Sequence, residues 1–184
     1  MNTSKSSENI KKMTAAGMLL AVALLLPFVT GQIPEVGNAL LPMHFPVILC
    51  GFICGWKYGG LIGFIAPLLR YALFGMPPIV PKGIPMAFEL ATYGIIAGLA
   101  YMILSKKMRH IVSIYVSLIL AMIVGRIIWG IATVILLGVQ GAPFTFPMFM
   151  AGAIINAVPG IIAQLIIIPI SIVALKKSRL VFNN

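Results

Sequence analysis

Residues 111–138 read IVSIYVSLILAMIVGRIIWGIATVILLG, a long apolar stretch in which Arg126 is the only charged side chain. An α-helix rises about 1.5 Å per residue, so roughly 20 apolar residues cross the ~30 Å hydrocarbon core of a bilayer. This stretch is long enough to cross with some tilt. It therefore predicts a transmembrane helix that carries one buried cation.

The rest of the chain has the same character. Of its 184 residues 61% are hydrophobic and only 9% are charged, and the mean hydropathy is +1.11. A soluble domain carries roughly 25% charged residues, so this chain lacks the polar surface that a water-soluble protein needs. We therefore expect an integral membrane protein.

Five further segments accompany this stretch, giving a predicted all-α membrane protein with a compact bundle of six transmembrane helices. No soluble domain or internal repeat is visible, so residues 1–184 form a single domain with a polar N-terminal tail at 1–12. The first apolar segment lacks a small-residue cleavage site, which indicates a retained span rather than a signal peptide. The six segments cover about 13–30, 40–56, 58–75, 84–105, 111–138 and 147–175.

The basic residues indicate the orientation of these spans. Ten of the 13 Lys and Arg residues fall near Lys5–Lys12, at Lys57, in 106–109 and in 176–179, all on one side of a six-span layout. Cytoplasmic ends carry such an excess, so both termini are predicted to be cytoplasmic. The formal charge of +10 then fits anionic lipid, and no nucleic acid is expected as a partner.

The loops on the opposite side are rich in Gly and Pro and are only weakly polar. They cover residues 31–39, 76–83 and 139–146, and Lys82 and Glu35 are their charged residues. Exposed loops are usually more hydrophilic, so we interpret these segments as lids that fold over a cavity. The alternative is that they are tight turns.

Three ionisable residues fall inside spans, where charge is costly and usually functional. Arg70, Glu89 and Arg126 can all lie in the outer half of the membrane. One alternative is a structural salt bridge between Glu89 and an arginine. However, two arginines and one carboxylate leave a surplus positive charge, and the planar fork of arginine suits a carboxylate or phosphate. The hypothesis is a cavity that binds a small anion.

Five other polar residues are candidates for the same binding site at plausible depths. Each could instead form a hydrogen bond to a neighbouring helix. These candidates are Asn38, His44, Lys82, Tyr93 and Asn156.

Metal and enzyme chemistry are both disfavoured. His44, Cys50 and Cys54 would span about 15 Å on a helix and have no fourth ligand, so a tetrahedral metal site is not expected. The chain has neither a phosphate-binding loop nor a nucleophile or metalloprotease motif. We therefore expect no cofactor and no enzymatic activity.

Small residues gather in the first span, where Gly17 and Ala21 are separated by four positions and follow Ala16. Such small-xxx-small spacing lets two helices approach closely. The partner helix could belong to this chain or to another protein.

The sequence resembles the substrate-binding (S) components of energy-coupling factor (ECF) vitamin transporters over nearly its whole length. The stretches NALLPMHFPVILCGFICGWKYGGLIGFIAPLLR, FGMPP and AFELATYG are most similar to the pantothenate-type branch. Branches for pyridoxine, the thiamine pyrimidine precursor or niacin remain alternatives.

The resemblance implies a vitamin pocket near the outer face of a prokaryotic cell membrane. It also implies assembly with a transmembrane scaffold protein and two cytosolic ATPase subunits that supply the energy. Gly17 and Ala21 are the nearest match to the family's A-x-x-x-A scaffold-facing motif. An autonomous secondary transporter, which usually has internal repeats, is the alternative from another class.

Overall fold

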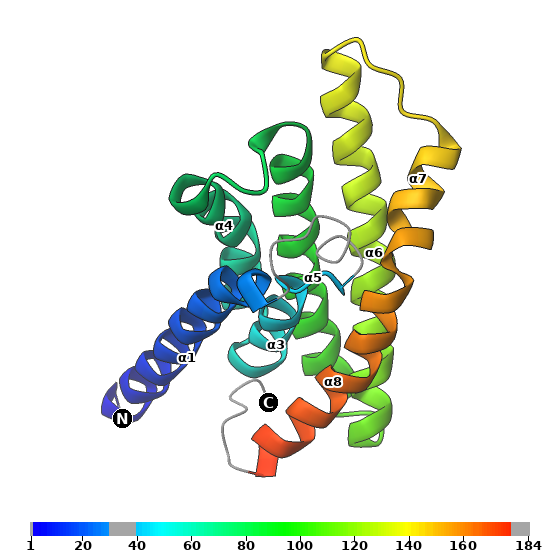
Figure 1. Cartoon of the computed structure of the whole chain (residues 1–184). Helices are drawn as coiled ribbons and strands as arrows, with labels where there is room; N and C mark the ends of the chain where they lie inside the picture. The colour runs from blue at the N-terminus through cyan, green and yellow to red at the C-terminus, as the bar shows by residue number, and fades with distance from the viewer. Residues whose placement is uncertain (1, 30–39, 178–184) are drawn as a thin grey trace.

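The computed structural model describes residues 2–29 and 40–177, and each element within those ranges is a helix (Figure 1). A π-helical turn, η1 (Ile79–Gly83), precedes α5, and a 3-10 turn, η2 (Ile155–Ala157), separates α7 from α8. The longer helices are α1 (Asn2–Val29), α3 (His44–Cys54), α4 (Trp56–Phe74), α5 (Ile84–Leu104), α6 (His110–Val139), α7 (Phe146–Ala153) and α8 (Val158–Lys177).

The helices match the six predicted segments in order but not all in length. Four helical stretches are long and apolar enough to cross a membrane: Ser6–Val29, Ile79–Leu104, His110–Val139 and Phe146–Lys177. α3 has 11 residues and is about 16 Å long, roughly half of a hydrocarbon core. α4 has 19 residues, but Lys57 and Arg70 reduce its apolar character. The prediction of six full spans is therefore confirmed for four.

Residues 2–12, which were predicted as a polar tail, are helical and form the start of α1. One other expectation needs correction. The segment 147–175, predicted as one span, is broken after Ala153, where Ile154 leaves the helical region with φ −123° and ψ −66°. Pro159 in the first turn of α8 has no N–H, so the break costs fewer backbone hydrogen bonds than it would elsewhere.

α3, α4 and α5 form a core in which glycines allow the helix backbones to lie in direct contact. A Cβ atom on Gly94 of α5 would lie 2.2 Å from the carbonyl oxygen of Gly59, and one on Gly63 would lie 2.3 Å from that of Leu90. A Cβ on Gly51 of α3 would lie 2.4 Å from the carbonyl oxygen of Gly94. These backbones are closer than any side chain would allow, so the three helices form a tightly packed unit.

The remaining helices surround this unit. α6 packs along α5, α1 leans outward, and α7 runs beside α6, while α8 crosses from α6 toward the lower end of α3 (Figure 1). The start of α1, the end of α8 and the α5–α6 turn lie toward the lower end of Figure 1, and the α4–η1 and α6–α7 connections lie at the upper end. The described ends of the chain thus share one side of the bundle.

The contact between α6 and α7 relies on two aromatic side chains, each placed against a glycine of the other helix. A Cβ added to Gly152 would lie 2.6 Å from the Trp129 ring, and a Cβ added to Gly130 would lie 2.5 Å from the Phe149 ring. Ala153 is the only buried residue of α7. α7 is therefore positioned by a few contacts and forms a thin wall beside α6.

Candidate functional site

A cavity of about 330 Å³ lies where α3, η1, α5, α6, α7 and η2 meet. Its walls combine polar and apolar side chains drawn from segments far apart in the sequence. The lining residues are Leu41, His44, Pro81, Lys82, Met86, Glu89, Arg126, Trp129, Thr133, Leu137, Gly152 and Asn156.

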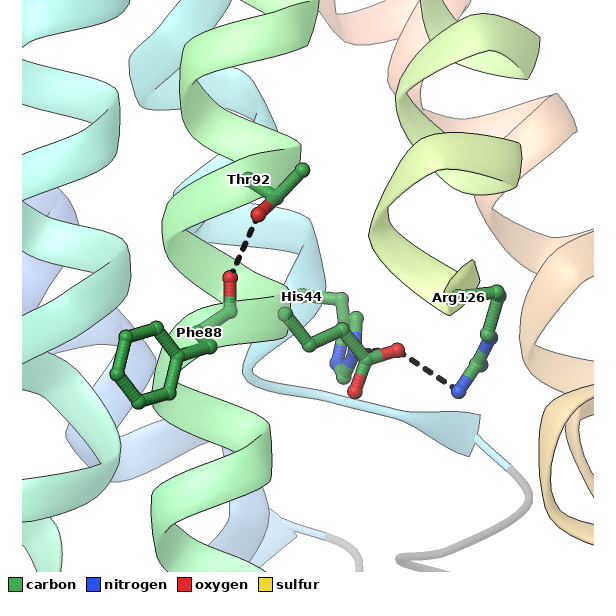
Figure 2. A network of polar contacts seen from close by, with 5 residues as sticks. His44, Phe88, Thr92 and Arg126 are labelled. Carbon is green, nitrogen blue, oxygen red and sulfur yellow. Dashed lines mark hydrogen bonds and ion pairs between the residues drawn. The ribbon is translucent and has the colours of Figure 1, made fainter. Parts of the chain in front are cut away.

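The charged centre of this cavity is a buried ion pair. Glu89 Oε1 of α5 lies 2.8 Å from Arg126 Nη1 of α6 and 3.5 Å from His44 Nε2 at the start of α3. Figure 2 shows His44 and Arg126 approaching this carboxylate from opposite sides. The exposed fractions are 1% for His44, 3% for Glu89 and 12% for Arg126. A carboxylate so deeply buried needs a cationic partner, and Arg126 supplies one.

Two donors of the Arg126 guanidinium remain unused. Nε and Nη2 are buried and have no hydrogen-bond partner among the residues that the structure describes. These atoms form the side-on edge of the guanidinium, whose two parallel N–H bonds match the two oxygens of a carboxylate. A buried donor without a partner costs about 1–3 kcal/mol, and more when it is charged. The site is thus arranged to gain energy from an acceptor group.

Each of these three side chains is held by local structure. His44 begins α3 between Pro42 and Pro46, and the edge of the Tyr93 ring supports its imidazole at a centroid distance of 5.2 Å. Gly125 lets the same Tyr93 ring lie against α6, because a Cβ there would approach the ring to 2.9 Å. Glu89 lies five residues, about one and a half turns, before Gly94 in the tightly packed unit. The ionic centre is therefore rigidly positioned.

Lys82 and Asn156 complete the polar lining. Lys82 on η1 is exposed at the rim, and Asn156 lies on η2, where the break between α7 and α8 turns the chain. Among the residues that the structure describes, the charged ones that line the cavity are Glu89, Arg126 and Lys82, so this part of the lining carries one surplus positive charge when His44 is neutral. This is the charge balance expected of a site for a monoanion.

Arg70, which was predicted to lie beside Glu89 and Arg126, does not line this cavity. Its Nη1 donates a hydrogen bond to the carbonyl oxygen of Leu24 in α1. Its guanidinium carbon lies 4.8 Å from the ring centre of Phe28 and 5.5 Å from that of Phe74. Arg70 therefore fastens α1 to α4. The surplus positive charge of the cavity comes from Lys82 instead.

One more predicted site residue, Tyr93, lies outside the cavity. Tyr93 supports His44 from below and is 1% exposed, but it does not line the cavity. Asn38 lies outside the described residues. His44, Lys82, Glu89, Arg126 and Asn156 are the predicted residues that the fold brings together.

Trp129, Thr133 and Leu137 also line the cavity, although they were not predicted as site residues. They follow Arg126 by three, seven and eleven positions, so helical periodicity places them on the face of α6 that Arg126 occupies. The Thr133 hydroxyl donates to the carbonyl oxygen of Trp129 at 2.7 Å, which leaves its lone pairs as acceptors. The period of the helix could have identified all three.

The residues predicted to face a scaffold protein divide between two sides of α1. Ala16 is 3% exposed and packs into the core, whereas Gly17 and Ala21 are exposed. A Cβ on Gly17 would meet nothing within 4 Å. Cys50 and Cys54, considered for a metal site, are buried free thiols in the core around α3.

Comparison of the chain with curated proteins and with solved structures finds no match. A family model does match, over residues 11–173, and it describes the substrate-specific component of ECF transporters. Such components bind a small-molecule substrate, work with an ECF module and are embedded in a membrane, which fits the four long apolar helices. The chain therefore belongs to the ECF transporter substrate-specific components, and it is a transport protein rather than an enzyme.

Proposed function

We propose that this chain captures a small vitamin carrying a carboxylate, with pantothenate the leading candidate, in the cavity around Glu89 and Arg126. The observation that carries the proposal is the unpaired side-on edge of Arg126, whose Nη1 forms an ion pair with the Glu89 carboxylate. A ligand carboxylate would satisfy Nε and Nη2 together. The surplus positive charge of the lining supports an anion in preference to a neutral molecule.

The rest of the lining fits a ligand with both polar and apolar parts. Trp129, Met86 and Leu137 offer apolar surface, while Thr133 and Asn156 offer hydrogen-bonding groups. Ligand pockets commonly combine a mostly apolar wall with a few placed polar groups. A volume of about 330 Å³ is at the small end of the usual range, which suits a vitamin.

The proposed orientation places this cavity near the outer face of a prokaryotic cell membrane. Exposed basic residues at the opposite end of the bundle support it, since cytoplasmic ends concentrate Lys and Arg. Lys106, Lys107 and Arg109 follow α5, and Lys176 and Lys177 end α8. The η1 turn and the α6–α7 connection then lie on the outside.

The energy for uptake would come from partners, a transmembrane scaffold protein and two cytosolic ATPase subunits. The chain contains no phosphate-binding loop of its own. Gly17 and Ala21 leave a shallow, exposed strip on α1 that permits a close helix–helix approach. We expect Gly17→Leu to prevent co-purification of the ATPase subunits while vitamin binding is retained. Equal recovery of the ATPases with Gly17→Leu would contradict this role for α1.

Ligand binding can be measured through Trp129, since the chain has only two tryptophans. Trp56→Phe leaves Trp129, in the cavity wall, as the single emitter. Titration with pantothenate should change this fluorescence saturably. Removing one partner of a buried charge pair costs about 2–5 kcal/mol, so Arg126→Gln should weaken binding by roughly 30-fold or more.

Lys57→Gln is the matched control, because it removes a cation at the opposite end of the bundle. It should leave the affinity unchanged. Mass spectrometry of the small molecule that survives purification identifies the natural ligand. A neutral ligand, or an Arg126→Gln variant that binds pantothenate as tightly as the parent, would refute the proposal. Uptake into liposomes by this chain alone would instead favour an autonomous transporter.

A further inference from the structure

Two apolar cavities lie between α6 and α7, and one of them reaches the Arg126 side chain. One, of about 480 Å³, lies between the second half of α6 and residues 144–149; the other, of about 410 Å³, lies between α6 and the α7–α8 break. Both are lined by Ile127 and Phe149, so they adjoin, and we call the two together the α6–α7 groove. Apart from Tyr93, Arg126 and Thr145, its walls are apolar or glycine.

The α6 side of this groove is a stripe of isoleucines spaced by four residues. Ile119, Ile123, Ile127, Ile131 and Ile135 lie along one face of α6, and their exposed fractions are 45%, 54%, 50%, 51% and 63%. At about 1.5 Å per residue the stripe extends over about 24 Å. It lies entirely within His110–Val139, a stretch long and apolar enough to cross a membrane, so in a bilayer the stripe would face lipid.

We propose that the α6–α7 groove binds an acyl chain of a membrane phospholipid. The combined volume of the two cavities, spread over about 24 Å, gives a cross-section of roughly 40 Å². A partner helix has a diameter of about 10–12 Å and would need at least about twice that section. A slender hydrocarbon chain fits, and it matches the apolar walls.

The volume supports the same occupant. A methylene group takes roughly the ~30 Å³ that one water molecule occupies in the liquid, so each cavity admits on the order of 14 to 16 carbons. Water would find few polar partners there and is disfavoured. A bound chain would contact Phe149 and brace α7 against α6, and α7 supplies Gly152 to the wall of the charged cavity.

The test is the number of phospholipids that the full-length protein retains. Protein reconstituted in palmitoyl-oleoyl phosphatidylglycerol and phosphatidylethanolamine would be re-extracted in a mild detergent and weighed by native mass spectrometry. Ile131→Trp and Ile123→Trp fill the two halves of the groove. Ile111→Trp is the control, because Ile111 is on the same helix with a similar exposed fraction, 53%, and does not line the groove.

We expect the parent and the Ile111→Trp protein to retain a lipid that both groove-filling variants lose at least five-fold. Melting curves establish that all four proteins are folded, and the Ile131→Ala variant, with a wider groove, should keep the lipid. Equal retention in all variants would overturn the proposal. So would a groove-filling variant that keeps its lipid but loses the bound vitamin, since the groove would then belong to the vitamin site.

Discussion

The Glu89–Arg126 pair permits a test in which ligand affinity and protein stability change in opposite directions. At 2.8 Å and an effective dielectric constant of about 20, the attraction between the two charges is about 6 kcal/mol. Desolvation offsets part of this, so removing one partner of a buried pair usually costs about 3–5 kcal/mol. We therefore expect Glu89→Gln to lower the apparent melting temperature by on the order of 10 °C.

Affinity for an anionic vitamin should respond differently. Glu89→Gln removes the negative charge beside the ligand carboxylate and leaves all of the Arg126 guanidinium available. The ligand then takes over the role of Glu89 as counter-ion. The increase in melting temperature on adding pantothenate should accordingly be larger for Glu89→Gln than for the parent protein, and it should vanish for Arg126→Gln.

The double variant separates a binding site from a structural salt bridge. Replacing both charges leaves no unpaired ion, so Glu89→Gln with Arg126→Gln should recover most of the stability lost by either single change. It should still fail to bind pantothenate. Thermal melting with and without the vitamin measures both quantities. A double variant that binds as well as the parent would refute the reasoning, and so would equal loss of binding in the two single variants.

Two further predictions concern the packing around the site. Gly94→Ala should destabilise the protein by more than about 2 kcal/mol, because its Cβ would lie 2.2 Å from the Gly59 carbonyl oxygen. Gly138→Ala is the control, because a Cβ there would meet nothing within 4 Å. Equal melting temperatures of the two variants would contradict the close packing of α4 and α5 through glycine. Arg70→Gln should loosen α1, seen as faster proteolysis after Lys11 or Lys12, without changing vitamin affinity. Loss of vitamin binding in Arg70→Gln would indicate that Arg70 does contribute to the binding site.

The sequence analysis located the helices well because hydropathy reports directly on membrane burial. The predicted segments 84–105 and 111–138 agree with α5 and α6 to within about one residue. The break after Ala153 escaped prediction because the residues on both sides of it are equally apolar. Hydropathy is insensitive to whether an apolar run is one helix or two.

For the binding site, the sequence indicates how deep a side chain lies in the membrane but not which way it points. Position along a span gives the depth of a charge, and Glu89 and Arg126 were expected at comparable depth and are in contact. Which way a side chain faces depends on how the helices rotate against one another. Arg70 was expected beside them, yet α4 turns it toward Leu24 and Phe28 of α1. The depth of a charged side chain follows from its position along its own helix, whereas the direction in which it points depends on the neighbouring helices.

The unequal packing around the cavity also indicates which part moves when a ligand binds. His44 and Glu89 sit on helices whose backbones are in direct contact through glycine, so their positions are fixed. The Nε and Nη2 atoms of Arg126 are buried, and a ligand reaches them only if the side chain or a wall of the cavity shifts. α7 is the wall with the least support, since it buries only Ala153 and borders two apolar cavities. Ligand entry is therefore expected to displace α7 while the ionic centre stays in place.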